Sequence, residues 1–333
     1  MPLIIQGDVQ MEWISGDKIP LLVICGPTAS GKTAVGAKLA SVLGGEVVSA
    51  DSMQIYKGME IASAAPTAEE MLGVPHHLVG IIEPGTPFSV ADYKKLAADT
   101  VSDISARKKL PVLVGGAGLY IDAVTDDLDF DSSASDGTVR RRLEAEAAEK
   151  GSAFMMDRLR ACDPDAAAKL HENNTVRVIR ALELYEVTGR TFDENMKLSR
   201  IKGSPYSVCM IGLNFEDRNV LYDRINRRVG IMAENGLEQE ERTLYESGCM
   251  KTSAQAIGYK ELVPYFEGNA SFEDCLDEIR KSSRHYAKRQ LTWFRRNAQI
   301  SWINRLENER IDEIIVKCLN IVAKSEIMCY NKK

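Results

Sequence analysis

The sequence is poor in the residues that build metal centres and disulfide frameworks. It has four histidines and seven cysteines, and no two cysteines stand at C-x-x-C spacing. An odd number of scattered cysteines argues against a disulfide framework and against a zinc finger. It fits a reducing compartment, so we expect a cytoplasmic protein.

Long apolar runs and net positive charge are also missing. No run approaches the roughly 18 apolar residues of a membrane-spanning helix, and residues 1–18 lack the pattern of a signal peptide. We therefore expect no membrane contact. The formal net charge is −6, so any contact with nucleic acid must come from a local basic surface.

What is present predicts an α/β fold. Apolar runs, helix-like segments and stop signals alternate through the first third of the 333 residues. The predicted strands are Ile19–Cys25, 46–50 and 111–114, and the predicted helices are 33–43 and 89–109, the second capped by Ser89 and Asp92. This order predicts a parallel sheet with helices on both faces.

The pattern changes after residue 130. Residues 131–200 carry no strand signal and predict three or four helices, and Tyr206–Phe215 reads again as a strand before a mainly helical remainder. We expect a catalytic core in two parts, 19–130 and 206–328, with an all-helical domain inserted at 131–205. About two domains also fit the chain length.

Between the first strand and the first helix lies a phosphate-binding loop. Residues 26–33 match G-x-x-x-x-G-K-[ST]: Gly26, Pro27, Thr28, Ala29, Ser30, Gly31, Lys32 and Thr33. Such a loop turns backbone N–H groups toward an anion at a helix N-terminus. Lys32 adds a positive charge, and the Thr33 hydroxyl suits Mg²⁺. A P-loop NTPase-like core is therefore predicted.

The loop alone does not identify the substrate. P-loop kinases and NTPases add an acidic Mg²⁺ partner on a second strand, but the strand at 111–114 ends in Gly115 and Gly116. The nearest strand-terminal acid is Asp51, which fits a metal-side acid, a general base or a turn cap. A small-molecule or nucleoside kinase stays open as an alternative.

Further along, the sequence resembles the tRNA dimethylallyltransferases (tRNA isopentenyltransferases). The resemblance extends from about residue 20 to 296 and follows the P-loop with ordered motifs that we know in no other family. These are SADSMQIYKGM at 49–59, PHHL at 75–78, FSVADY at 88–93, VGGAGLY at 114–120, RVIRALE at 177–183, IGYKE at 257–261 and AKRQLTWF at 287–294.

The resemblance implies an activity and a set of site residues. The family transfers a dimethylallyl group from dimethylallyl diphosphate to the exocyclic amine of the adenosine 3′ of the tRNA anticodon, with Mg²⁺. It implies that Asp51 receives the amine proton, that Thr28 faces the reacting centre and that Lys32 and Arg228 hold the diphosphate. The implied tRNA contacts are Asp51, Ser52, Met53, Gln54, Ala117, Arg140, Val176, Arg177, Val178, Ile179, Arg180, Gln255, Ala256, Ile257, Gly258, Tyr259 and Lys260. It also implies a monomer that binds the anticodon arm.

Two positions depart from the family pattern. The family commonly has lysine where Ala65 stands and threonine where Ala117 stands. Both changes put substrate affinity in doubt, and neither removes Lys32, Thr33, Asp51 or Arg228.

A basic stretch near the end of the chain offers a surface for RNA. Residues 280–296 contain seven Lys or Arg and no acid, with Tyr286, Trp293 and Phe294 interleaved. A basic helix with Trp293 in the core is the plainer interpretation, and both can hold. Arg224 and Arg228 share a helix face, but the family match assigns only Arg228. We interpret His76 and His77 as structural.

Three functions therefore remain at this stage. The prenyl transfer to tRNA is favoured over the P-loop kinase, because the basic stretch has no role in a kinase. A tRNA-binding protein without catalysis is supported only by Ala65 and Ala117.

Overall fold

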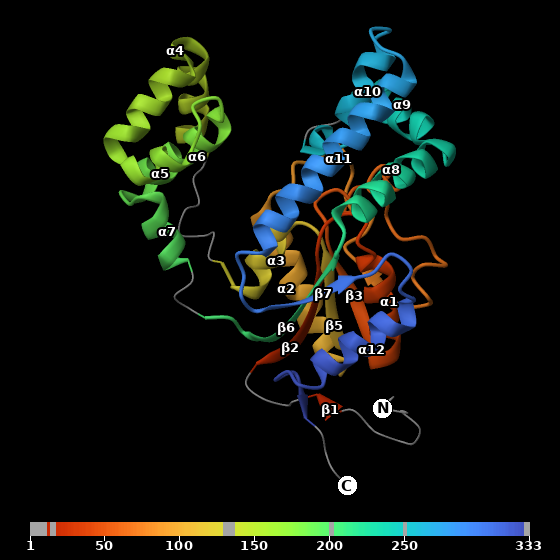
Figure 1. The fold of residues 1–333 in the computed structure, drawn as a ribbon. Coiled ribbons are helices and arrows are strands. Elements are labelled where there is room, and N and C mark those ends of the chain that lie inside the picture. The colour runs from red at the N-terminus through yellow and green to blue at the C-terminus, as the bar shows by residue number, and fades with distance from the viewer. Residues whose placement is uncertain (1–11, 14–17, 129–136, 200–202, 249–251, 330–333) are drawn as a thin grey trace. The chain divides into compact units, whose positions relative to one another are not determined.

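A parallel six-stranded sheet forms the centre of the larger of two units (Figure 1). The computed structural model describes residues 12–13, 18–128, 137–199, 203–248 and 252–329. The larger unit comprises Met1–Thr125 with Pro205–Lys333, and the smaller comprises Asp126–Ser204.

The strands run in the order β4-β3-β5-β2-β6-β7. They are β2 (Ile19–Cys25), β3 (Gly45–Ala50), β4 (His76–His77), β5 (Leu110–Gly115), β6 (Tyr206–Phe215) and β7 (Ile300–Arg305). Central β2 and β5 are almost entirely apolar because both faces of a parallel sheet are covered, and β3 is equally buried but includes the polar residues Glu46 and Ser49. A separate antiparallel pair joins β1 (Glu12–Trp13) to β8 (Met328–Cys329).

Helices cover both faces of this sheet. One face packs against α1 (Lys32–Leu43) and α12 (Ile311–Val322), and the other packs against α2 (Val90–Ala106) and α3 (Gly118–Thr125). Two separate apolar cores result, one on each face. The predicted α/β class is confirmed.

The remaining helices of this unit lie beyond the carboxyl ends of the strands (Figure 1). They are α8 (Arg218–Glu234), α9 (Leu237–Ser247), α10 (Tyr259–Phe266) and α11 (Phe272–Phe294), with a 3₁₀ turn at Thr252–Gln255. They share a third apolar core that includes Val229, Leu237, Leu262 and Ile279. Of these helices, α8 and α11 line the pocket described below together with the strand ends.

The smaller unit is helical throughout its described residues. It contains α4 (Thr138–Cys162), which is kinked at Gly151, and α5 (Pro164–Lys169), α6 (Thr175–Thr188) and α7 (Phe192–Leu198). Leu143, Met156, Leu159 and Leu182 belong to its own core. The boundary predicted at residue 131 falls within 129–136, outside the described residues. The predicted role of this segment in gripping tRNA stays a prediction.

Local signals predicted most elements well. The capping box at the start of α2 forms as expected, with the Ser89 side chain accepting from the Asp92 N–H and the Asp92 carboxylate accepting from the Ser89 N–H. Strand β7 lies in a stretch that we expected to be mainly helical. Because β7 is an edge strand, buried and exposed residues alternate irregularly along it, so its sequence lacks the apolar run that predicts a buried strand.

Among the helices of the described chain, none combines the length and the apolarity that crossing a lipid bilayer requires.

Candidate active site

The phosphate-binding loop lies at the carboxyl end of β2 and is held by groups from distant parts of the chain. Gly31 adopts φ +91° at the N-cap of α1, and a Cβ there would lie 2.3 Å from Arg305 Nη1. That arginine donates to Ser30 O at 2.7 Å, and Arg224 Nε donates to Ala29 O at 3.0 Å. Two loop carbonyls are therefore fixed by cations of β7 and α8, which holds the loop in shape.

Gln290 of α11 joins the loop to the end of β5. Its Oε1 accepts from the Thr28 N–H at 2.8 Å, and its Nε2 donates to Gly116 O at 2.9 Å. A Cβ at Gly116 would lie 2.2 Å from that Nε2, so only glycine allows this approach. The AKRQLTWF motif contains Gln290, but its sequence context gave no sign of this contact.

One pocket brings together most of the predicted catalytic residues. Its lining includes Thr28, Lys32, Thr33, Asp51, Gln54 and Arg228, together with Tyr286, Gln290 and His76. The volume of this site, including the part open to solvent, is about 610 Å³. Loop, strand ends and outer helices thus converge on a single site, as the sequence predicted for its charged members.

The cations of the pocket are crowded. Arg228 Nη1 donates to Thr28 Oγ1 at 3.0 Å, and Lys32 Nζ donates to Pro27 O at 2.7 Å. Burial, and then the neighbouring Arg228, lowers the pKa of Lys32 to about 8, while Asp51 opposes the shift. Burial also lowers the pKa of Arg228. Two partly desolvated cations beside a P-loop form a site for a highly charged anion.

Asp51 follows β3 and faces the same pocket. Its Oδ1 accepts from the backbone N–H of Met53 at 2.9 Å and of Gln54 at 3.4 Å. The carboxylate therefore caps a turn, as the plainer interpretation held, but this contact uses only Oδ1. Oδ2 takes no part in these two turn contacts.

The adjoining Gln54 ties Asp51 to the next loop. Its Nε2 donates to Ser63 O and Ala64 O, and its Oε1 accepts from Ser49 Oγ. The Arg228 guanidinium also donates to Ser63 O, at 3.4 Å. Loop 61–64 is therefore held by the amide of one predicted site residue and the guanidinium of another.

The two departures from the family pattern lie beside the pocket. Ala117 donates its N–H to Ala50 O at 3.2 Å and packs against the core, and Ala65 donates its N–H to Glu60 O at 2.9 Å. Neither side chain belongs to the pocket lining.

The other predicted tRNA contacts are distributed over both units. Arg140 in α4 pairs with Glu144, and in α6 the side chains of Val178 and Ile179 are enclosed in the core, whereas Val176 is 68% exposed. Only the exposed members of α6 present side chains to a partner. Gln255 and Lys260 are exposed, while Ala256 and Gly258 are buried.

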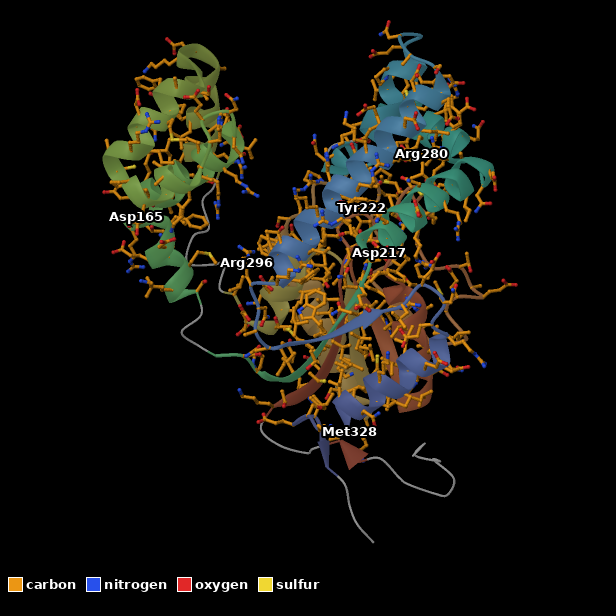
Figure 2. All side chains as sticks on the ribbon, in the orientation of Figure 1. Asp165, Asp217, Tyr222, Arg280, Arg296 and Met328 are labelled. Carbon is orange, nitrogen blue, oxygen red and sulfur yellow. The ribbon has the colours of Figure 1, made fainter. Side chains whose placement is uncertain are left out.

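The basic stretch 280–296, whose two end residues Arg280 and Arg296 are labelled in Figure 2, divides into two parts by its contacts. Toward the start of α11, Arg280 pairs with Glu273 and Asp277, Lys281 pairs with Glu278, and Arg284 donates to Asn226. Toward its end, the side chains are exposed and none has an acidic partner among the described residues. These are Lys288, Arg289, Arg295 and Arg296. The surface available to a polyanion is thus the later part.

Trp293 fits both interpretations of this helix, the structural one and the RNA-binding one. Its indole Nε1 donates to Asp122 Oδ2 at 2.9 Å, which anchors α11 to α3, and Arg296 stacks over its ring. The aromatic body is structural, and it also orients one cation of the exposed part.

Metal ligands are scarce in the described residues, where no group of three or more His, Cys, Asp or Glu is placed to hold an ion. The pocket nevertheless fits Mg²⁺ that arrives with a phosphate ligand. The Thr33 hydroxyl lines it, and the buried atoms His76 Nε2 and Ser63 Oγ have no protein partner. Mg²⁺ commonly retains several waters and needs few protein ligands beside substrate phosphates.

Comparison with known proteins finds close relatives. The family model described as IPP transferase matches residues 54–297. A tRNA dimethylallyltransferase of Geobacillus thermodenitrificans is 48% identical over 291 residues, covering 87% of this chain and 92% of the relative. The tRNA dimethylallyltransferase of Bacillus subtilis is 45% identical over 292 residues, with the same coverage.

Solved structures agree with the sequence relatives. The crystal structure of the tRNA isopentenylpyrophosphate transferase of Bacillus halodurans is 46% identical, covers 92% of this chain and 96% of that one, and aligns with a TM-score of 0.70. A eukaryotic dimethylallyltransferase acting on tRNA is 27% identical, covers 92% of this chain and 80% of its own, and aligns with a TM-score of 0.78.

Proposed function

Since the chain belongs to the IPP transferase family, whose relatives are tRNA dimethylallyltransferases, we propose that it prenylates tRNA. The reaction transfers a dimethylallyl group from dimethylallyl diphosphate to the N6 amine of the adenosine 3′ of the anticodon and releases diphosphate. The observation that carries the proposal is that one pocket is lined by the P-loop, by Arg228 and by the carboxylate of Asp51.

Asp51 is the proposed proton acceptor. The lone pair of an adenine amine is conjugated into the ring, which makes the amine a weak nucleophile. As the N–C bond forms, the amine proton passes to the carboxylate, an aid worth about 10²–10⁴-fold. The turn held by Oδ1 orients the carboxylate toward the pocket.

The P-loop side is the proposed diphosphate site. The allylic C–O bond breaks with its electron pair on the departing diphosphate, so the developing charge is the main barrier. Lys32, Arg228 and the loop N–H groups stabilise that charge. Mg²⁺, held through Thr33 and the phosphate oxygens, supplies further charge neutralisation when bound.

Substrate RNA is the proposed second partner. The target base leaves its stack to reach a pocket inside the protein. We infer that the exposed cations at the end of α11 and the exposed residues of α6 contact the anticodon arm. Such contacts position the RNA and take no part in bond making.

A transfer assay tests the function. The protein is incubated with labelled dimethylallyl diphosphate and unmodified tRNA, and separately with ATP and candidate nucleosides. Label in tRNA supports the proposal, whereas ATP turnover without tRNA labelling supports a kinase. Binding of tRNA without either reaction supports the non-catalytic alternative. Lys32→Ala is the inactive control, and Lys38→Ala on the same helix is the matched active one.

A further inference from the structure

His76 is the one histidine in the pocket lining, and its ring has a fixed orientation. Nδ1 lies 2.9 Å from Val74 O. A carbonyl oxygen can only accept, so Nδ1 carries the proton and Nε2 carries a lone pair. That Nε2 is buried and has no hydrogen-bond partner among the described residues. A buried acceptor without a partner is costly, which points to a donor that binds in this pocket.

The sheet places this ring on the side of the P-loop helix. His76 pairs in register with Val47 of the parallel strand β3, so the two side chains point to the same face. Val47 packs in one apolar core with Val35 and Leu39 of α1. Thr33 stands in the first turn of α1 and lines the same pocket. His76 therefore lies on the same side of the sheet as α1 and lines the same pocket as the threonine proposed to hold Mg²⁺.

The proposed substrates limit what can donate to Nε2. Diphosphate oxygens only accept hydrogen bonds, and an allylic chain has no polar hydrogen. The adenine amine has two protons and could donate one while the other passes to Asp51, so the adenosine is the competing donor that the tRNA readout below distinguishes. Water bound to Mg²⁺ is a strong donor because the metal polarises it, and Mg²⁺ usually keeps several such waters.

We propose that His76 is a positioning residue of the donor site, whose Nε2 accepts a hydrogen bond from a water of the Mg²⁺ that accompanies the diphosphate. The proposal rests on the proposed function. Kinases place an acidic residue near the metal at the end of a second strand, whereas β5 ends at Gly115 and is followed by Gly116. His76 would be the uncharged counterpart of that acidic residue. A neutral acceptor orients the hydrated ion without adding negative charge beside a departing diphosphate.

Burial supports this assignment. It lowers the pKa of His76, an effect that the neighbouring His77 reinforces and the contact with Val74 opposes. The ring is then neutral at pH 7, and its Nε2 remains an acceptor.

Two substitutions separate the roles of the two ring nitrogens. His76→Asn retains a donor near the Nδ1 position and removes the acceptor at the ε position. His76→Gln places an amide oxygen near the Nε2 position. The control is His77→Asn, because His77 bonds Glu46 and does not line the pocket.

Calorimetric binding of inorganic pyrophosphate, with saturating Mg²⁺ and with EDTA, is the measurement. We expect His76→Asn to lose about three- to tenfold in affinity with Mg²⁺, the usual effect of one lost hydrogen bond, and nothing in EDTA. His76→Gln and His77→Asn should keep the Mg²⁺-dependent part of the affinity. Melting curves for all variants identify any loss of fold.

Three outcomes overturn the proposal. Unchanged affinity of folded His76→Asn in Mg²⁺ would mean that Nε2 has no role at the metal. An equal loss with and without Mg²⁺ would mean a packing role. A raised KM for tRNA alone would instead assign Nε2 to the adenosine. A wild-type protein that binds pyrophosphate but does not prenylate tRNA would refute the proposed function and leave this result readable.

Discussion

Gln290 accepts a hydrogen bond from the Thr28 N–H while its own amide donates to Gly116 O, so one side chain of α11 links the residues that follow two neighbouring strands. Replacing it with alanine leaves a buried donor and a buried acceptor unpaired, at a cost of about 1–3 kcal/mol each. We expect Gln290→Ala to melt at lower temperature and to bind pyrophosphate more weakly. Thermal melts and calorimetry measure both effects.

The control for Gln290 is on the next turn. Thr292 is exposed and bonds only Lys288 O of its own helix, so Thr292→Ala should behave like the wild type. Normal pyrophosphate binding by Gln290→Ala would show that the loop keeps its shape without the α11 contact.

Lys32 gives the diphosphate site a pH dependence. Burial holds its pKa at about 8, and a bound anion raises it, because the charged form gains a partner. Binding above pH 7 therefore takes up protons, about half a proton at pH 8. We expect pyrophosphate affinity to fall as pH rises through 8. Calorimetry in buffers of different ionisation enthalpy counts the protons.

Pyrophosphate itself titrates in this range, so the comparison with Lys32→Met isolates the lysine. The variant should lack the uptake and should show no turnover, while its tRNA affinity changes little. Equal proton uptake in both proteins would assign the titration to another group.

Asp51→Asn separates the turn cap from the base. An asparagine oxygen can still accept from the N–H groups of Met53 and Gln54, so the turn should persist. Proton acceptance is lost, and we expect a fall of about 10²-fold or more in the single-turnover rate. Rapid-quench kinetics with saturating substrates measures it. A variant that loses pyrophosphate or Mg²⁺ affinity at an unchanged chemical rate would move Asp51 to the metal.

The end of α11 should determine the salt dependence of tRNA binding. Each phosphate contact contributes a slope of roughly −0.7 to −0.9 in log K against log salt. The triple replacement of Lys288, Arg289 and Arg296 by alanine should reduce the slope by about two to three. The rate at saturating tRNA should remain near normal, since none of these three side chains belongs to the pocket lining.

The paired cations at the start of the helix provide the comparison. Arg280 and Lys281 already have acidic partners, so their double alanine variant should leave the slope unchanged. An unaltered slope in the triple variant would place the tRNA contacts elsewhere, above all at Arg140 and Arg180.

Glu241 predicts a loss of stability with rising pH. Its side chain is fully buried in α9, and neither carboxylate oxygen has a partner among the described residues. Burial first, then Glu240 and Glu261, raises its pKa to about 8. The folded state then binds more protons than the unfolded state between about pH 4.5 and 8, so stability declines across that window by roughly 3–5 kcal/mol.

Glu241→Gln mimics the protonated form and should remove that decline. Melting temperatures from pH 5 to 9 should diverge, with the variant increasingly more stable than the wild type. Glu246→Gln, exposed on the same helix, is the control and should follow the wild type. Parallel curves for Glu241→Gln and the wild type would show that Glu241 does not titrate.

The sequence predicted the parts of the site that are formed by residues close together in the chain. The P-loop, the acid after β3 and the cap of α2 are local patterns, so they were predicted from residues a few positions apart. Arg228 came from the family resemblance, and its place beside Thr28 fits that assignment. The contacts of Gln290, Arg224 and Arg305 with the P-loop were not predicted, because each joins residues that are about 200 or more positions apart in the sequence. Glu241 was missed because an acid on a helix usually indicates a solvated face.

Strand order also has a consequence for synthesis of the chain. Strand β2 lies between β5 and β6, and its partner Tyr206–Phe215 follows it by more than 180 residues. A nascent chain that ends before β6 has an unpaired apolar edge on β2, the kind of surface that aggregates and recruits chaperones. Gln290 and Arg305, which hold the P-loop, are synthesised later still, because they lie in α11 and β7. Synthesis of α11 and β7, rather than emergence of the P-loop, therefore sets the moment at which the chain can first form its complete donor site.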